Sequence, residues 1–561
     1  MDIKATYENS HLDVIRLLLA AEYSEAMRLA CRNGHADVVR LLLADSRVHP
    51  GDYCNQAIRY ASENGHSNVV RILLADSRVN PADNNNIAVR RACKNGHVDV
   101  VRLLLADGRT VPADDHNEAM HSACENGHID IVRLLLADGR FNPGDHKNEA
   151  IRRACEKGHI DVVRLLLADN RVNPADYNNY AIILACGNGH IDIVRLLLAD
   201  SRVNPADDKN IAIRRACEKG HVDVVRLLLA DNRVNPGDND NLAIRWTCAN
   251  GHVDVVRLLL ADSKVNPVDK NGDVMRLACA NGHTDVVRLL LADGRVNPGN
   301  GNYAIEWACR YGHLDTVRVL LADGRVDPGE YKNSAIQAAC ENGHIDVVRV
   351  LLVDNRVNPG DSHNSALRLA CQHGHVDVVC LLLADSRVNP ADDNNAPIRW
   401  ACRYGCVDVI RLLLADGRAN PACGNNEPMR EACENSHIEI VCLLLMDPRV
   451  DICCVILTHP SIVHRFGEEE TVCAILALAG IKPFCCTKWG LLNPDMYNLE
   501  ILCRWQEKRH GILYQQDKDF RDGPYGVLLR RRLEIADLHG SDVLATRLPV
   551  EMVELVLEYM K

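Results

Sequence analysis

The sequence predicts an all-α fold: a solenoid of about fifteen helix-turn-helix units with short finger loops, followed by a small helical C-terminal domain. Two observations lead to this prediction. A segment close to NGHVDVVRLLLADGRVNP returns with a period of 31 residues, with one step of 30. After about residue 450 the period ends, and other helical patterns follow. We therefore expect a repeat array over residues 1–450 and a second domain over residues 451–561.

A glycine before a histidine marks each repeat. So regular a period means that each unit buries its apolar face only by stacking on its neighbours. Ser436 takes the marker place in the last copy, and the glycine markers before it are Gly34, Gly65, Gly96, Gly127, Gly158, Gly189, Gly220, Gly251, Gly282, Gly312, Gly343, Gly374 and Gly405.

Within one repeat the pattern predicts two helices and a turn. The first helix, AIRRACEKG (Ala150 to Gly158), is short and ends at a glycine that can adopt a positive φ. The second, HIDVVRLLLAD (His159 to Asp169), carries an acidic residue in its first turn, where the helix dipole favours an anion. Its expected apolar stripe is Val163, Leu166 and Leu167. Pro174 then turns the chain, because proline cannot continue a helix.

Composition excludes several classes of protein. An apolar content of 47% is too high for a disordered chain. With a net charge of −12 there is no bulk basic field, so we expect no nucleic-acid partner. No stretch reaches the length of a membrane span, and the N-terminus lacks the features of a signal peptide, so we expect no membrane partner. We place the protein inside the cell, in the cytoplasm, with the nucleus left open.

The 24 cysteines do not predict a disulfide framework. Thirteen of them recur at one place in the repeat, usually after an alanine in the first helix, so they read as small buried hydrophobic residues in a reducing compartment. They are Cys31, Cys93, Cys124, Cys155, Cys186, Cys217, Cys248, Cys279, Cys309, Cys340, Cys371, Cys402 and Cys433.

The recurring histidines and Asp–Arg pairs have structural interpretations. One histidine per repeat is not the cluster that a metal needs, so we expect each one to bond to nearby backbone at a helix start. Pairs such as Asp37 and Arg40, or Asp99 and Arg102, are typical of a solvated helix face. No acid–base or nucleophile set stands out from the periodic background. We therefore predict no enzymatic activity, no metal and no cofactor.

The second-helix pattern GHxDVVxLLL closely resembles the ankyrin repeat. Fifteen copies of this signature run from His11 to His437, so the resemblance covers roughly residues 1–450. The period of 31 is shorter than the family's, about 33. The family's TPLH motif is replaced by sequences such as Ala-Ile-Arg. The resemblance implies stacked helix pairs with shortened fingers, and a concave surface that binds a protein partner.

Two variable series are the candidates for that surface. The finger series follows a recurring aspartate and includes Tyr53, Asn84, Asp115, His146, Tyr177 and Asp208. The inner-helix series precedes the Ala-Cys pair or its equivalent, and its tryptophans are Trp246, Trp307 and Trp400. Tryptophan and arginine often anchor interfaces. The inner-helix positions also fall where the family usually packs a leucine, so core packing remains an alternative for them.

The C-terminal residues 451–561 contain helical patterns at Glu468 to Gly480, Pro494 to Gly511 and Gly526 to Gly540. The last segment, LPVEMVELVLEYM (residues 548–560), resembles the first helix of an F-box. The matching residues are Leu548, Pro549, Glu551, Met552, Val553, Val556, Leu557, Tyr559 and Met560.

That resemblance implies docking on the Skp-type adaptor of a cullin ubiquitin ligase. A full F-box has about two further helices, but ankyrin proteins of poxviruses, which are large DNA viruses, end in such a truncated F-box-like segment (the PRANC arrangement). If this protein is viral, its place is the host cytoplasm. Asn498 to Cys503 offers an alternative, the Leu-x-x-x-Cys of an elongin-binding box. The tail helix packing within its own domain is another.

The order of these parts predicts a substrate-recruiting adaptor. The array would capture a protein, and the F-box-like helix would recruit a cullin-type ligase. The alternative is a plain binding or sequestering scaffold with a purely structural C-terminal domain.

Overall fold

The computed structural model describes residues 23–110, 117–268, 272–299, 303–445, 447, 449 and 450. Within these ranges every regular element is a helix, and the helices form successive antiparallel pairs. The predicted all-α solenoid is therefore confirmed. The first predicted unit, around His11, and all elements predicted in residues 451–561 lie outside the described residues.

Fourteen helix pairs make up the described part of the array. The first helices are α2 (Tyr23–Asn33), α4 (Asp52–Glu63), α6 (Asp83–Asn95), α8 (Glu118–Glu125), α10 (Asp145–Lys157), α12 (Asp176–Gly187), α14 (Asp207–Lys219), α16 (Asp238–Asn250), α18 (Asp273–Ala280), α20 (Tyr303–Arg310), α22 (Glu330–Glu341), α24 (Asp361–Gln372), α26 (Asp392–Tyr404) and α28 (Cys423–Glu434). The second helices are α3 (Ala36–Ala44), α5 (Ser67–Leu74), α7 (Val98–Asp107), α9 (Ile129–Ala137), α11 (Ile160–Leu167), α13 (Ile191–Leu198), α15 (Val222–Leu229), α17 (Val253–Ala261), α19 (Thr284–Asp293), α21 (Leu314–Ala322), α23 (Ile345–Val353), α25 (Val376–Leu383), α27 (Val407–Asp416) and α29 (Ile438–Leu445).

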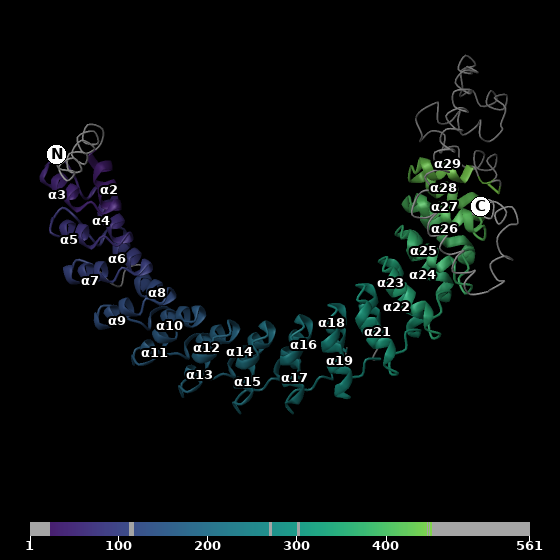
Figure 1. The fold of residues 1–561 in the computed structure, drawn as a ribbon, viewed down its shortest axis with the longest axis horizontal. Coiled ribbons are helices and arrows are strands. Elements are labelled where there is room, and N and C mark those ends of the chain that lie inside the picture. The colour runs from purple at the N-terminus through teal and green to yellow at the C-terminus, as the bar shows by residue number, and fades with distance from the viewer. Residues whose placement is uncertain are drawn as a thin grey trace, which may run out of the picture. The chain divides into compact units, whose positions relative to one another are not determined.

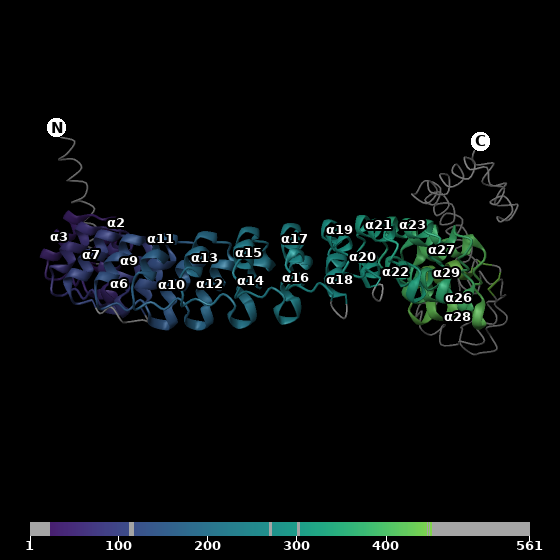
Figure 2. The ribbon, with the colours of Figure 1, turned by 90° about the horizontal axis from the view of Figure 1, so that it is seen from below.

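The chain divides into two compact units at residues 361 and 362. In the first unit the first helices lie along the inner side of an arc and the second helices along its outer side (Figure 1). Seen from below, the same helices form two rows, α10 to α18 in one and α11 to α19 in the other (Figure 2). This places the first helices on the concave side. The predicted domain boundary at residue 450 stays a prediction.

The core repeats along the array. In the repeat of α10 and α11, the buried residues of the first helix include Ala150, Ile151, Ala154 and Cys155. The second helix buries Val162, Val163 and Leu166, whereas Leu167 is only half-buried. The predicted stripe was therefore wrong by one member, because the outer helix turns Val162 rather than Leu167 towards the core.

The repeated cysteines are fully buried, as predicted. Cys155, Cys186 and Cys217 are each 0% exposed in consecutive first helices. Burial raises the pKa of each of these thiols, because a thiolate would lose its hydration. They act as small hydrophobic residues that let neighbouring first helices pack closely.

A glycine–histidine contact joins most described repeats to the one before it, and Cys406 takes the histidine place against Gly374. Gly158 has a φ of +84°, and a Cβ there would lie 2.7 Å from Cε1 of His190 in the next repeat. Nε2 of the same histidine lies 2.9 Å from the carbonyl oxygen of Glu156. The histidine thus bonds to backbone, as predicted, but to the backbone of the preceding repeat.

A loop arginine makes a second connection between repeats. Arg171 donates to both oxygens of Asp169, at 2.9 and 2.6 Å, and this lowers the pKa of the aspartate. The fixed guanidinium also donates to the carbonyls of Phe141 (3.1 Å) and Leu136 (3.2 Å) in the preceding repeat. Arg78, Arg109, Arg140, Arg295, Arg325, Arg356 and Arg418 reach back to two carbonyls in the same way. Lys264 takes this place once, where it bonds to the carbonyl of Val234.

Two glycines only two residues apart, Gly187 and Gly189, test the glycine–histidine contact. Gly189 has a φ of +77° and its Cβ would meet Nδ1 of His221 at 2.7 Å, so Gly189→Ala should destabilise the array. The left-handed backbone alone costs about 1–2 kcal/mol in an alanine. Gly187 lies within α12, where a Cβ would meet only Cβ of Arg215 at 3.6 Å. Gly187→Ala should therefore be neutral or stabilise by up to about 1 kcal/mol.

Urea unfolding followed by circular dichroism distinguishes the two variants. The expected result is a lower midpoint for Gly189→Ala and an unchanged or higher midpoint for Gly187→Ala. Equal midpoints would contradict the close approach of the histidine.

Candidate functional site

Each finger that the structure describes in full is a single turn of left-handed backbone. In the repeat of α12, the φ values of Tyr177, Asn178 and Asn179 are 54°, 56° and 57°. Such a conformation costs about 1–2 kcal/mol per residue for L-amino acids, and asparagine tolerates it best among those with a side chain. Three in succession need compensation from neighbouring groups.

The last residue of the finger supplies much of this compensation. Asn179 is buried, donates from Nδ2 to Asp207 of the next repeat at 2.9 Å, and accepts from the backbone N–H of Asn204 at 2.8 Å. The same pair of bonds recurs at Asn55, Asn148, Asn210, Asn333 and Asn364. Gly272 takes the asparagine place once, with a φ of 64°. Sequence reasoning missed this function, although the repeated D-x-x-N pattern was visible.

An arginine of the first helix binds the carbonyls of the left-handed turn. Arg152 donates to the carbonyl of Lys147 at 3.1 Å and to that of His146 at 3.0 Å. Arg214 does the same in its own repeat, and Gln337 donates to the carbonyl of Lys332 at 2.6 Å. The fingers are therefore fixed to the first helices. This function was also not predicted, because these arginines read only as polar helix positions.

The predicted finger residues stand at exposed tips. Tyr53, Asn84, His146, Tyr177 and Asp208 are all exposed, and each is the first of three left-handed residues. Asp115 lies outside the described residues.

Two of these tips are aromatic rings next to cations. The Arg28 guanidinium lies 5.1 Å from the ring centroid of Tyr53. Lys147 and Arg152 lie 4.8 and 5.2 Å from that of Tyr177. Half or more of each tyrosine remains accessible, at 62% for Tyr53 and 50% for Tyr177.

The predicted tryptophans are neither core nor freely exposed. Trp246 and Trp307 are half-buried, each with an arginine of the preceding repeat near its ring: Arg214 at 6.0 Å and Arg276 at 5.3 Å. In the second unit, Trp400 is also half-buried and lies 5.6 Å from both Arg368 and Arg403. Part of every ring therefore remains accessible to a partner.

The sequence model of the family "Ankyrin repeats (3 copies)" matches residues 3–85, 58–148, 89–181, 151–240, 182–271, 243–330, 305–392 and 367–455. The chain belongs to the ankyrin-repeat family. No curated protein matches the sequence. Ankyrin repeats bind protein partners and generally act as non-enzymatic scaffolds, which is the class of protein that the array represents.

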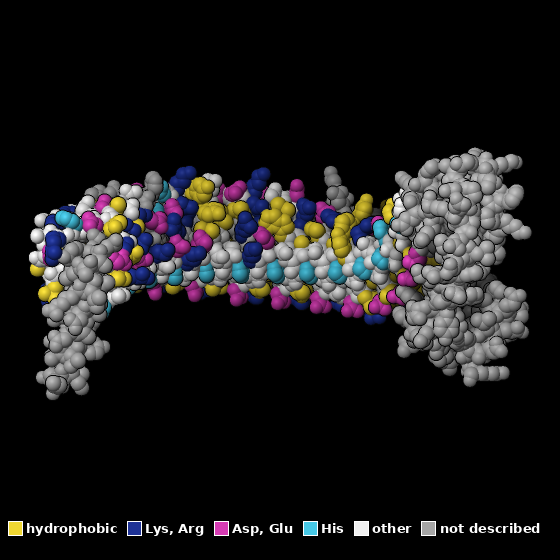
Figure 3. All heavy atoms as spheres, turned by 90° about the horizontal axis from the view of Figure 1, so that it is seen from above, with side chains coloured by type: hydrophobic (Ala, Val, Ile, Leu, Met, Phe, Trp, Pro, Cys, Tyr) yellow, Lys and Arg dark blue, Asp and Glu magenta, His cyan; other side chains and the backbone are white. Residues whose placement is uncertain are grey.

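The concave face of the first unit is chemically divided. Figure 3 shows a row of histidines, with hydrophobic and basic side chains on one side of it and acidic side chains on the other. The second helices carry exposed aspartates in their first turns, such as Asp161, Asp192 and Asp223. The tryptophans and arginines described above belong to the first helices. A partner that lies along the first helices therefore meets apolar and basic groups.

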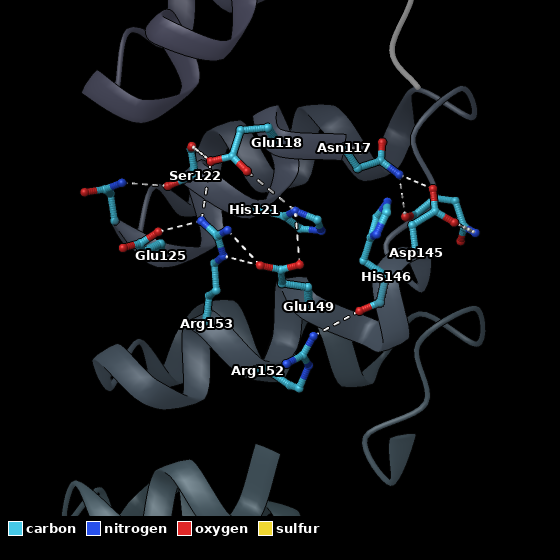
Figure 4. Close-up of polar contacts among 12 residues, drawn as sticks. Asn117, Glu118, His121, Ser122, Glu125, Asp145, His146, Glu149, Arg152 and Arg153 are labelled. Atoms are coloured by element: carbon cyan, nitrogen blue, oxygen red, sulfur yellow. Dashed lines mark hydrogen bonds and ion pairs between the residues drawn. The ribbon is translucent and has the colours of Figure 1, made fainter. Parts of the chain in front are cut away.

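Not every ankyrin first helix offers free charges. Arg153 of α10 pairs with Glu149 and Glu125 at 2.7 Å and with Glu118 at 3.4 Å, so it is neutralised by its own and the preceding repeat (Figure 4). Ser122 donates to Glu118 within the same cluster, at 3.0 Å. This part of the face is held together internally.

A buried histidine lies within this cluster. His121 is 2% exposed, and its Nδ1 lies 3.9 and 4.0 Å from carboxylate oxygens of Glu118 and Glu149 (Figure 4). Burial lowers the pKa of His121 to about 4, against the attraction of Glu149 and with the help of the positive charges of Arg153, His146 and Arg152. The side chain is therefore neutral at physiological pH.

Within the described ranges, no group of three or more His, Cys, Asp or Glu side chains is arranged to hold a metal ion. None of the described helices is long and apolar enough to cross a membrane. What these residues can do, on their geometry, is present aromatic rings and guanidinium groups to another molecule.

His121 makes stability depend on pH in a predictable direction. The folded pKa, about 4, lies below the ordinary value of 6.5, so its contribution is complete above pH 6.5 and is lost as the pH falls towards 4. Gln337 occupies the same repeat position, so His121→Gln should fold and should lose less stability between pH 7 and pH 5 than the wild type. Urea midpoints at the two pH values measure this difference. Equal losses in both proteins would show that His121 does not titrate in this window.

Proposed function

We propose that the protein is a substrate-recruiting adaptor: the ankyrin array captures a protein, and the C-terminal segment links it to a cullin-type ubiquitin ligase. The capture half rests on one observation, the half-exposed tryptophans and tyrosines next to arginines on first helices and fingers. Trp246, Trp307 and Tyr177 are of the types that contribute most to protein interfaces. Trp246 and Trp307 lie within helices and the finger of Tyr177 is fixed by the hydrogen bonds of Asn179, so binding would require little ordering.

The ligase half rests on the order of the parts and on the F-box-like pattern. Leu548, Pro549 and Leu557 match the residues with which an F-box helix meets its Skp adaptor, and they follow an ankyrin array as in the PRANC arrangement. These residues lie outside the described part of the chain. The plain scaffold, in which the same helix only stabilises its own domain, is the competing function.

Site-specific photo-crosslinking tests the capture half. We expect p-benzoylphenylalanine that replaces Tyr177, at an exposed finger tip, to crosslink a cellular protein. The matched control is the same residue at Arg164, which is exposed on second helix α11. Because both positions are exposed, neither change should affect folding. A crosslink at Arg164 and none at Tyr177 would place the binding surface on the outer helices instead.

Co-precipitation of the full-length chain tests the ligase half. The wild type should recover a Skp adaptor and a cullin, whereas Leu548→Ala/Leu557→Ala should recover neither and still capture the array's partner. Circular dichroism of both proteins accompanies the measurement. Failure of the wild type to recover either ligase subunit, together with loss of helical signal in the variant, would favour the plain scaffold.

A further inference from the structure

Two arginine–tryptophan pairs lie on neighbouring first helices of the first unit. Arg214 of α14 faces Trp246 of α16, and Arg276 of α18 faces Trp307 of α20. In both pairs the arginine comes from the preceding repeat. We name the surface made by these residues and their neighbours the tryptophan–arginine face; its members are Arg214, Arg215, Trp246, Arg276, Leu277 and Trp307.

The apolar part of this face is accessible and nearly continuous. Trp246, Leu277 and Trp307 occupy the same position in three successive repeats, and all three are half-buried. Tyr311 extends the row, with its ring 5.7 Å from that of Trp307 and 51% of its surface exposed. Aliphatic or aromatic side chains of a partner would bury apolar surface against this row, and removing that surface from water favours binding.

On the helical parts of α14, α16 and α18, without their left-handed finger residues, cations outnumber carboxylates. On α14, α16 and α18, Glu218 pairs with two cations, Arg215 at 3.0 Å and Lys219 at 3.5 Å. Asp273 likewise pairs with two, Arg245 and Arg276, both at 2.7 Å. Each of these carboxylates therefore neutralises only one of the two cations that it contacts.

Arg214 adds a further positive charge. Arg214 is only 8% exposed, its hydrogen bonds go to the carbonyls of Lys209 and Asp208, and among the described residues no carboxylate lies within ion-pair distance of it, so its charge acts on the face from just below the surface. This surplus stands out in a protein whose net charge is −12. The exposed acidic groups nearby, Asp208 and Asp240, belong to the left-handed finger residues at the start of α14 and α16 rather than to the helical parts.

We infer that the tryptophan–arginine face binds an extended protein segment in which carboxylates stand next to aliphatic or aromatic side chains. The apolar side chains lie against Trp246, Leu277 and Trp307, and the carboxylates pair with the accessible cations that share a carboxylate, Arg215, Lys219 and Arg276. Guanidinium–carboxylate bonds beside a tryptophan ring are shielded from water and so are stronger than exposed ones. This inference rests on the proposed capture of a protein and specifies its chemistry.

Other repeats supply replacements that preserve the fold. Leucine already occupies the tryptophan position in two other repeats, at Leu184 and Leu277. Trp246→Leu and Trp307→Leu therefore remove the rings with a residue that this position of the repeat accepts. Glutamine is native at the arginine position in Gln337, where it keeps the bond to the finger carbonyl. Arg214→Gln therefore removes a charge and can retain a bond to its finger, and Arg276→Gln removes the charge beside Trp307.

The probe is a displayed library of random twelve-residue peptides, selected on the full-length protein. Individual peptides are then measured by fluorescence anisotropy at two salt concentrations. The expected peptides are rich in Asp and Glu next to Leu, Ile, Phe or Trp. Their affinity should fall with added salt, and should fall at least about tenfold in Trp246→Leu/Trp307→Leu and in Arg214→Gln/Arg276→Gln. Tyr60→Leu and Arg59→Gln, at the same two repeat positions near the N-terminal end, are the controls and should bind as the wild type does.

The outcomes separate this inference from the proposed function. Peptides that bind the face but carry no excess of acidic residues overturn the inference and leave protein capture standing. Selected peptides whose affinity is unchanged in both double variants overturn it as well, since they bind elsewhere. No selected peptide, together with no crosslink at Tyr177, would overturn both.

Discussion

The close approach of a histidine to a glycine of the preceding repeat is the contact on which the stack depends. It requires a residue without a side chain at the end of each first helix, and it requires that residue to adopt a positive φ. Once it forms, the histidine ring reaches a backbone carbonyl that the helix end leaves free. The loop arginines and finger asparagines add their own bonds between repeats. Because these bonds go largely to backbone or to recurring aspartates, they do not depend on the variable residues.

This arrangement separates stability from recognition. The buried alanines, cysteines and valines and the bridging side chains recur with little change, whereas the first-helix and finger positions between them vary. Arg153 is fully engaged by three glutamates, but Arg215, at the same position two repeats later, is exposed and pairs with one glutamate that Lys219 also contacts. One scaffold can thus carry a locked polar cluster in one place and an accessible aromatic and basic surface in another. Lys264, which replaces a loop arginine, and Gly272, which replaces a finger asparagine, lie close together in sequence.

Much of the array could be predicted from the sequence, because period and apolar pattern reflect burial directly. The helix pairs, the buried cysteines and the positive φ of the marker glycines all followed from spacing. The outer-helix stripe was placed one residue wrong, at Leu167 instead of Val162, since a short helix leaves its rotation poorly defined. The left-handed fingers and their Arg152 and Asn179 contacts were not predicted, because hydrophobic periodicity does not report the hand of the backbone. Partner-binding functions for Tyr53, Trp246 and the other candidate residues stay predictions, as do those of the C-terminal helix.

The histidine and arginine bridges between repeats also have a direction. Each bridging histidine and loop arginine reaches back, by about 34 residues for the histidine, to carbonyls that were synthesised earlier. As the chain leaves the ribosome, every new unit therefore finds its acceptors already in place on the unit before it. A solenoid bonded in this way can grow vectorially from its N-terminal end, and a unit gained or lost within the array leaves the acceptors of the next one unchanged.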